Sequence, residues 1–308
     1  MKKSLVYILT IGLLLISVSC SGSINGPHPF LGINSDGSVY CLNDEIREIK
    51  IPRRINGKKV TALANSAFNG CTHLESVTIP NSVTSIGNLA FYNCRSLESI
   101  SIPNSVTSIG SSAFADCKSL ESVTISDKIT SIGDYTFDNC RSLESISIPN
   151  SVKSIGYRAF FGCASLTSVT IGNSVTSIDS YAFAFCSSLT SITLPNSVTS
   201  ISYSTFDMCS SLTSVTMGNN VTSIGTMAFS QCYSLTDINI PDSVSSIGNY
   251  AFSNCESLKS ISIPDKVTYI YADTFYDCSS LKSIYINKKK DSISGAPWGA
   301  ENATVYWK

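Results

Sequence analysis

The stretch LESISIPNSVTSIGSSAFADC, residues 97–117, contains most of one unit of the pattern that decides the fold. The unit recurs every 23 residues, with no insertion or deletion, over ten copies. The cysteines that mark its register are Cys71, Cys94, Cys117, Cys140, Cys163, Cys186, Cys209, Cys232, Cys255 and Cys278. A repeat with a period of roughly 20–50 residues must stack its units side by side, because one unit cannot bury its apolar side chains alone.

Within the unit, the pattern predicts two extended sides and a return turn. Residues 99–102 alternate serine with isoleucine, which is typical of a short strand with one buried face. Pro103 has no N–H to donate to a neighbouring strand and therefore ends this side. Residues 106–109 form a second, shorter extended side, and residues 113–117 return the chain through a short turn or a helical turn.

The repeat therefore predicts a leucine-rich repeat solenoid dominated by β-structure. One face should carry a parallel β-sheet, and the other should carry short turns or 3₁₀/α turns. Ten full 23-residue coils occupy residues 67–286, after an N-terminal cap and partial repeat over residues 38–66. A five-residue insertion at 53–57 reads as a small hairpin, and residues 287–308 are expected to form a C-terminal cap.

The amino-terminal segment has the features of an export signal. Lys2 and Lys3 precede an apolar run from Leu5 to Ile16, and small residues then precede Cys20. This arrangement resembles the lipobox of bacterial lipoproteins, in which the cysteine is lipidated and becomes the mature amino terminus. The resemblance implies a signal peptide over residues 1–20, with ordinary signal cleavage as the alternative. Residues 21–37 are predicted to be a flexible leash, and no other apolar run is long enough for a membrane helix.

The unit L-x-S-[VI]-x-I-P-x-S-V-T-S-I-G-x-x-A-F-x-x-C resembles the BspA-like, or Treponema-type, leucine-rich repeat, from residue 49 to about residue 307. The resemblance implies an exported bacterial protein, lipid-anchored in the outer membrane or at the cell surface and attached to membrane only through its lipid. It also implies adhesion, with a protein ligand such as host extracellular matrix or another microbe as partner. It identifies no ligand-contacting residue, because the shared motif is core.

The sequence offers little material for catalysis. Histidine occurs only as His28 and His73, and no nucleophile, metal-ligand or phosphate-binding motif is present, so we expect no enzyme, cofactor or metal. With 21 basic and 22 acidic residues, a nucleic-acid partner is not expected either. Equivalent cysteines on successive coils should point in parallel, which favours a column of buried free thiols; scattered disulfides are the alternative.

Ligand contacts should lie where the repeat varies. Positions that are polar in most coils carry large aromatic side chains in three consecutive coils, and we call this set the aromatic patch: Tyr157, Phe161, Tyr181, Phe185 and Tyr203. Contiguous exposed aromatic surface is typical of binding sites. The alternative is that some of these rings tuck under the turn as extra core. A glycan is a second candidate ligand, and a purely structural envelope spacer is a third interpretation.

A second variable position follows each repeat leucine and changes charge along the chain. It is Glu in four coils, Thr in the next four and Lys in the last two: Glu75, Glu98, Glu121, Glu144, Thr167, Thr190, Thr213, Thr236, Lys259 and Lys282. One interpretation is an electrostatic gradient that orients an elongated ligand. The other, which we favour on sequence alone, is local pairing of the glutamates with Arg95, Lys118 and Arg141.

Overall fold

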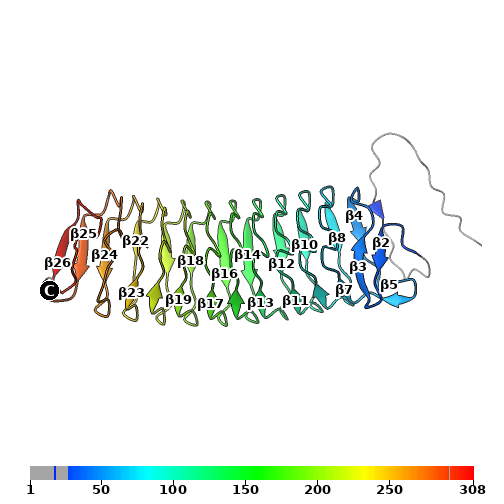
Figure 1. Ribbon diagram of the computed structural model, residues 1–308, viewed down its shortest axis with the longest axis horizontal. Helices are drawn as coiled ribbons and strands as arrows, with labels where there is room; N and C mark the ends of the chain where they lie inside the picture. Colours follow the sequence, from blue (N-terminus) through cyan, green and yellow to red (C-terminus); the bar gives the residue numbers. More distant parts are fainter. Residues whose placement is uncertain (1–16, 19–26, 291) are drawn as a thin grey trace, which may run out of the picture.

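The computed structural model describes residues 17–18, 27–290 and 292–308 of the chain. Over these residues the chain winds into an elongated stack of coils, whose first and last coils lie at opposite ends (Figure 1). The fold is a parallel β-solenoid, as the repeat predicts, and equivalent residues on adjacent coils pair in register at intervals of 23 residues. Cys20, the predicted lipidation site, lies outside the described residues.

The first row of strands carries the longer extended side of each coil. Within it, the strand Ser145–Ile148 pairs residue by residue with Ser168–Ile171 on the next coil. Its isoleucines point into the core and its serines are exposed, which is the alternation that the sequence predicts. The row comprises β4 (Glu48–Lys50), β8 (Ser76–Thr78), β10 (Ser99–Ser101), β12 (Ser122–Thr124), β14 (Ser145–Ile148), β16 (Ser168–Ile171), β18 (Ser191–Thr193), β20 (Ser214–Thr216), β22 (Asp237–Ile238), β24 (Ser260–Ile263), β25 (Ser283–Ile286) and β26 (Thr304–Trp307).

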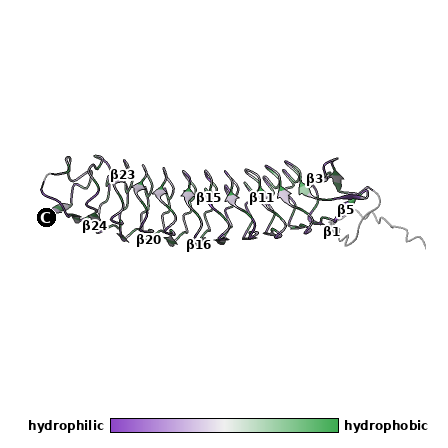
Figure 2. Cartoon of the chain, turned by 90° about the horizontal axis from the view of Figure 1, so that it is seen from below, coloured by the Kyte–Doolittle hydropathy of each residue, from purple (hydrophilic) through white to green (hydrophobic). Residues whose placement is uncertain are grey.

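The second row carries the shorter extended side, and it runs along the opposite side of the stack (Figures 1 and 2). Most of its strands are a Ser–Ile pair, with the isoleucine buried. The row comprises β3 (Ser38–Cys41), β7 (Ala62–Leu63), β9 (Ser85–Ile86), β11 (Ser108–Ile109), β13 (Ser131–Ile132), β15 (Ser154–Ile155), β17 (Ser177–Ile178), β19 (Ser200–Ile201), β21 (Ser223–Ile224) and β23 (Ser246–Ile247).

A column of ten buried phenylalanines fills the core beneath the return turns. These residues, which we call the inner ladder, are Phe68, Phe91, Phe114, Phe137, Phe160, Phe183, Phe206, Phe229, Phe252 and Phe275, each 0% exposed. Neighbouring rings stack with centroids 5.1–5.8 Å apart and planes within 14° of parallel. The column runs the length of the repeat because each coil places its phenylalanine at the same point.

The return turns contain no helix in the described residues, so the helical or 3₁₀ turn considered from the sequence is wrong. In the first coil, the N–H groups of Ala67, Asn69 and Cys71 each donate to the carbonyl three residues earlier, which makes a succession of tight turns. Ser66 and Gly70 interrupt any helix, because their φ angles are 56° and 76°, in the left-handed region. Most coils repeat this pair of left-handed residues around their phenylalanine.

The amino-terminal cap differs from the expected leash. Strand β2 (Leu31–Ile33) pairs antiparallel with β3, and His28 and Leu31 are both buried, so the leash predicted over residues 21–37 is wrong from His28 onward. An apolar side chain at Leu31 covers the open end of the core, which the leash interpretation overlooked. Ser17–Val18 (β1), within the predicted signal peptide, pairs with β4.

The two irregular segments that the repeat cannot accommodate are short and well defined. The insertion forms a hairpin of β5 (Arg54–Ile55) and β6 (Lys58–Lys59), whose turn residues Asn56 and Gly57 both have positive φ, as a tight hairpin requires. At the carboxyl end, β26 closes the first row in parallel with β25. Beside it, Trp298 is 1% exposed and covers the end of the inner ladder, with its backbone carbonyl accepting from Phe275 N.

Candidate ligand-binding surface

Four tyrosines form an outer ladder on the surface of the return turns: Tyr135, Tyr157, Tyr181 and Tyr203. Their ring centroids lie 5.3, 5.8 and 5.2 Å apart in order, and each ring meets the next edge to face, at 68–83°. The spacing along the chain is 22, 24 and 22 residues, so the tyrosines alternate between two adjacent positions of the coil. The alternation sets the edge-to-face geometry, because rings at one repeated position would stack as the inner ladder does.

The rest of the aromatic patch packs against the outer ladder. Phe161 lies 4.9 Å from Phe185 and 6.5 Å from Tyr181, measured between ring centroids. At the far end, Tyr203 Oη lies 3.5 Å from Met227 Sδ. The structure thus brings all five residues of the aromatic patch together on the turn side, as the repeat spacing predicts. Sequence reasoning missed Tyr135, although its place two residues before the inner ladder is the place of Tyr181.

The rings of the aromatic patch and the outer ladder differ in their exposure to solvent. Phe185 and Tyr203 are each 39% exposed and Tyr135 is 36% exposed, whereas Tyr157, Phe161 and Tyr181 are half-buried. The interpretation that some rings tuck under the turn therefore holds only in part, since none of the five is fully buried. A side-chain hydrogen bond with Tyr203 raises the pKa of Tyr181 to about 12.

A cation and a carboxylate adjoin the patch. The Arg158 guanidinium lies 3.6 Å from the centroid of the Phe161 ring and 5.6 Å from that of Tyr135. Its Nε is 3.0 Å from Asp138 Oδ2. Asp138 is 6% exposed, and burial raises the pKa of its carboxyl to about 6 even though Arg158 opposes that shift. Arginine and tyrosine are enriched among the hot-spot residues that contribute most of the binding energy in protein interfaces. Sequence reasoning missed Arg158, because a single basic residue carries no periodic signal.

Two residues of the aromatic patch hold a backbone conformation that bulky side chains disfavour. Tyr181 and Phe185 have φ angles of 58° and 61°. At the position of Phe185, most coils carry residues that tolerate this conformation: Gly70, Asn93, Asp116, Asn139, Gly162, Asn254 and Asp277. A left-handed conformation costs an ordinary L-residue roughly 1–2 kcal/mol. The conformation itself recurs at both positions in most coils and belongs to the return turn.

A shallow polar groove runs along the second row of strands over the same coils. It has a volume of about 480 Å³ and crosses β13, β15, β17 and β19. Its polar lining comes from repeated serines and two carboxylates: Ser111, Ser131, Ser154, Ser177, Ser200, Ser202, Asp134 and Asp179. Tyr157 follows a glycine of the groove and Tyr203 follows Ser202 in the chain, so the groove and the outer ladder share coils.

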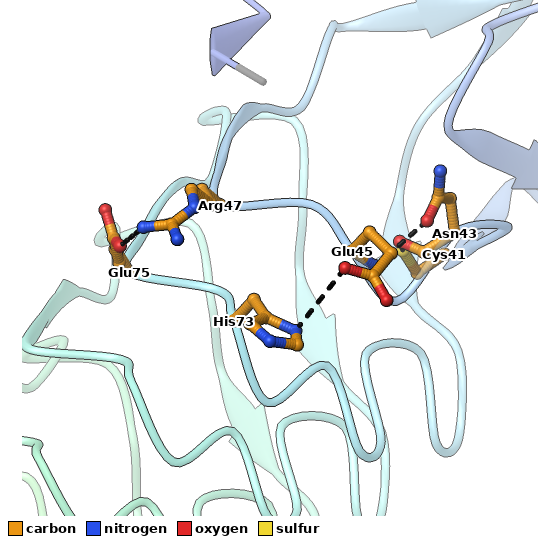
Figure 3. A network of polar contacts seen from close by, with 6 residues as sticks. All are labelled: Cys41, Asn43, Glu45, Arg47, His73 and Glu75. Carbon is orange, nitrogen blue, oxygen red and sulfur yellow. Dashed lines mark hydrogen bonds and ion pairs between the residues drawn. The ribbon is translucent and has the colours of Figure 1, made fainter. Parts of the chain in front are cut away.

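The charge gradient persists without the local pairing that we favoured from the sequence. Among residues 27–290 and 292–308, no ion pair joins Arg95, Lys118 or Arg141 to the glutamates of the gradient. Arg95 donates instead to Asn93 Oδ1 at 2.8 Å, and Lys118 lies 4.0 Å from an Asp116 oxygen. Local pairing therefore does not run through the three bases that the sequence indicated, although Glu75 does pair with Arg47 of the preceding coil (Figure 3).

The repeat cysteines line the core as free thiols. All ten are buried, and burial raises the pKa of those from Cys94 to Cys278 above its usual range. In the part of the chain that the structure describes, no group of three or more His, Cys, Asp or Glu residues is arranged to hold a metal ion. Nor does that part include a helix with the length and apolarity needed to cross a membrane.

Parallel coils of 23 residues with a leucine and isoleucine core define a leucine-rich repeat solenoid. The chain belongs to the BspA-type leucine-rich repeat family. The family model, described as a BspA type leucine rich repeat region in six copies, matches residues 37–143, 61–190, 109–235 and 176–297. No curated protein sequence matches the chain.

Several solved structures are similar to the chain. A leucine-rich repeat protein from Bacteroides ovatus is 25% identical, with a TM-score of 0.58, and the match covers 91% of this chain and 99% of that one. The pneumococcal vaccine antigen PcpA is 18% identical, with a TM-score of 0.51 over 94% of this chain and 84% of its own. A T. pallidum leucine-rich repeat protein is 30% identical, with a TM-score of 0.48 over 68% and 91% of the two chains.

Proposed function

We propose that the protein is a non-catalytic binding protein of the bacterial envelope that presents the aromatic patch to a protein ligand. The observation that carries the proposal is the outer ladder, a continuous strip of exposed and half-buried tyrosines. Two of them, Tyr157 and Tyr203, stand at a position that holds a small residue in all of the other coils. Tyrosine and arginine dominate the energetic centres of protein interfaces, and Arg158 lies against the patch. The family, whose members are generally non-catalytic repeat proteins, agrees with this role.

The repeat supplies substitutions that should leave the fold intact. Asparagine occupies the position of Tyr157 and Tyr203 in coils that contain Asn88 and Asn249, and serine occupies that of Tyr181 in the coil of Ser112. We therefore design the variant Tyr157→Asn, Tyr181→Ser, Tyr203→Asn. The matched control is Tyr269→Ser, since Tyr269 is 56% exposed and lies outside the patch, at a position held by Ser246 one coil earlier.

The test uses a panel of purified host extracellular-matrix proteins as immobilised probes. The wild-type chain and the Tyr269→Ser control should show saturable binding to at least one of them. The triple variant should lose at least tenfold in affinity, because each central interface tyrosine contributes about 1 kcal/mol or more. Equal affinity of the triple variant and the wild type would remove the outer ladder from the proposal.

A glycan is the second candidate ligand, and the polar groove favours it. Serine hydroxyls and the carboxylates of Asp134 and Asp179 line the groove beside a strip of aromatic rings. Hydroxyls and carboxylates bind vicinal sugar hydroxyls, and rings pack on sugar faces, so this surface suits a polysaccharide chain. Saturable binding on a glycan array, with none on the matrix panel, would replace the protein ligand by a glycan. If neither the matrix panel nor the glycan array showed saturable binding, the interpretation of the protein as a structural envelope spacer would remain.

Attachment to the envelope is proposed through lipid on Cys20. The support is the segment of small residues before Cys20 that follows an apolar run. Cells given a labelled fatty acid should incorporate the label into the wild-type chain and not into Cys20→Ser. Protease treatment of intact cells should then digest the wild-type chain if it faces outward. Protection from protease would exclude a host ligand, and absence of label would replace lipid anchoring by ordinary signal cleavage.

A further inference from the structure

A small pocket lies at the amino-terminal end of the outer ladder, where Tyr135 is the first ring. It has a volume of about 220 Å³. Ser112 and Ala115 of one coil line it, together with Tyr92 of the coil before and with Tyr135 and Asp138 of the coil after. Pockets that take whole small molecules usually measure about 300–1,000 Å³. This pocket therefore has the size for a single side chain.

The pocket exists because one coil carries small residues at two positions of its return turn. Ser112 stands one coil before Tyr135 in the same column, and Ala115 stands between Tyr92 and Asp138 in another. At a coil spacing of about 4.8 Å, backbones two coils apart are separated by roughly 9.6 Å. A flat group in contact with a surface on each side needs roughly 7–8 Å. The notch therefore admits one flat group at the place where the outer ladder would carry its next ring.

The charged groups of the lining favour a cation. The carboxylates of Asp116 and Asp138 both line the pocket, and Arg158 is the only basic side chain in the lining. Arg158 is already engaged, since its Nε lies 3.0 Å from Asp138 Oδ2 and its guanidinium lies 3.6 Å from the centroid of the Phe161 ring. Lys118 Nζ is 4.0 Å from Asp116 Oδ1, in a partly exposed pair that contributes little. The pocket can therefore accept a further positive charge.

The second oxygen of Asp138 is independent evidence for a missing partner. The Asp138 side chain is 9% exposed, and its Oδ1 is buried without a hydrogen-bond partner among the described residues. A buried carboxylate oxygen without a donor is unfavourable and uncommon in proteins. Because the torsion that turns a carboxyl group is broad, Asp138 can direct an oxygen toward a donor held in the pocket that it lines.

We propose that this pocket binds a guanidinium group, and that in the complex the group belongs to an arginine of the protein ligand. The assignment to the ligand rests on the proposed function, whereas the affinity for guanidinium does not. A guanidinium is flat, packs on tyrosine rings and presents its N–H groups in a fork that matches a carboxylate. It would lie against Tyr92 and Tyr135 and donate to Asp138. The outer ladder would then continue into the ligand.

The test titrates the folded, isotopically labelled chain with N-acetylarginine amide at about pH 7.5, where the Asp138 carboxyl is ionised, and follows backbone amide signals by NMR. Amides near Ala115 and Asp138 should shift saturably, with a dissociation constant on the order of a few millimolar. The uncharged analogue N-acetylcitrulline amide should bind at least about tenfold more weakly, because the charge-assisted hydrogen bonds are lost. N-acetyllysine amide should also bind more weakly, because an ammonium is neither flat nor forked.

The repeat supplies a variant that fills the pocket. Ser112 and Tyr135 share a column and a left-handed backbone, with φ angles of 55° and 56°, so Ser112→Tyr adds one ring to the outer ladder and removes no charge. It should abolish binding of the arginine probe. The matched control Tyr250→Ser, in the same column but far from the pocket, should retain it. Asp138→Asn should weaken binding about tenfold, and asparagine already holds this position at Asn69.

Three results would each overturn the affinity for guanidinium: no saturable shift at about 50 mM arginine probe, equal affinity for the citrulline probe, or probe binding retained by Ser112→Tyr. If the wild-type chain binds a matrix protein, Ser112→Tyr should lower that affinity about tenfold as well. Unchanged affinity there would overturn the assignment to the ligand. These outcomes are distinct from failure of the proposed function, in which no matrix protein binds and the arginine probe still decides what the pocket accepts.

Discussion

The inner and outer ladders are aromatic columns on the same coils, yet the sequence builds them differently. The inner ladder repeats one residue type at one position, and its rings stack within 14° of parallel in full burial. The outer ladder alternates between two positions, and its rings meet edge to face at the surface. The inner ladder occurs in all ten coils, whereas the outer ladder occupies four.

The comparison separates the aromatic residues that stabilise the fold from those that the fold only displays on its surface. Strict repetition gives every inner phenylalanine the same neighbours, and burial of each ring contributes to stacking the coils. The outer tyrosines add little burial, and Tyr181 holds a left-handed backbone that small residues adopt more easily. We propose contact with a ligand, rather than stability, as the reason for their presence at these positions. Four changes would break or sharpen this distinction.

The largest effect should come from alkaline pH, through the buried thiols that line the core beside the inner ladder. Burial raises the pKa of the column thiols above the value of 9.0 for an exposed cysteine. Their contribution to stability is therefore complete below pH 9 and is lost as pH rises above it, because only the unfolded chain releases the protons. At pH 10 each buried thiol lowers the free energy of unfolding by about 1.4 kcal/mol. Over nine thiols the loss is on the order of 10 kcal/mol for a stack that unfolds as one unit.

Urea unfolding followed by circular dichroism at pH 8 and pH 10 measures this loss. The unfolding midpoint should fall sharply, and returning the sample to pH 8 should restore it, which excludes chemical damage. A midpoint that stays constant between the two pH values would show that the thiols are not buried as a column.

A single truncation in the inner ladder should have the next largest effect. Phe160 is 0% exposed and stacks on Phe137 and Phe183 at 5.3 and 5.2 Å, so Phe160→Ala leaves a cavity between two rings. The expected loss in unfolding free energy is about 3–5 kcal/mol. Tyr157→Asn, in the same coil of the outer ladder, should cost less, about 1–2 kcal/mol, because its half-buried ring loses two edge-to-face contacts. Similar losses in urea titrations of the two variants would mean that the outer ladder is structural.

The sequence predicts the inner half of this comparison almost completely. A 23-residue period fixes which residues share a column, and alternation fixes which of them face inward, so Phe68, Cys94 and their equivalents could be assigned to the core without coordinates. The helical return turn was wrong because the left-handed backbone of Ser66 and its equivalents has no sequence signal: serine, leucine, tyrosine and arginine all occur there.

For the outer ladder, the sequence predicts which coils carry aromatic residues but not how their rings contact one another. The repeat indicates that Tyr157 and Tyr181 lie on adjacent coils, but their edge-to-face contact depends on side-chain directions at two neighbouring turn positions. The ion pair of Arg158 with Asp138 joins different coils at different positions, so no column contains both residues.

A smaller effect should follow from moving one ring of the outer ladder without removing it. The double change Ser180→Tyr, Tyr181→Ser places the tyrosine in the column of Tyr157 and Tyr203 and keeps the composition constant. The three rings would then stack as the inner ladder does, and their faces would no longer be presented to a ligand. Affinity for the matrix protein that the wild-type chain binds should fall about tenfold, measured by surface plasmon resonance, with unfolding unchanged within about 1 kcal/mol. Unchanged affinity would show that composition, not alternation, matters.

The smallest effect isolates the strain at the edge of the patch. Met208 has a φ of 59° at a position where other coils carry Asn93, Asn139 and Asn254, so Met208→Asn should raise the unfolding free energy by about 0.5–1 kcal/mol. Phe185→Asn relieves the same strain but also removes a ring packed 4.9 Å from Phe161, a contact worth about 0.5–1.5 kcal/mol, so its net change should be near zero. Urea titrations of the two variants measure the difference. If Phe185→Asn stabilised the protein as much as Met208→Asn does, the Phe161–Phe185 contact would contribute nothing to the fold, and the reason for a strained phenylalanine there would lie wholly in the ligand.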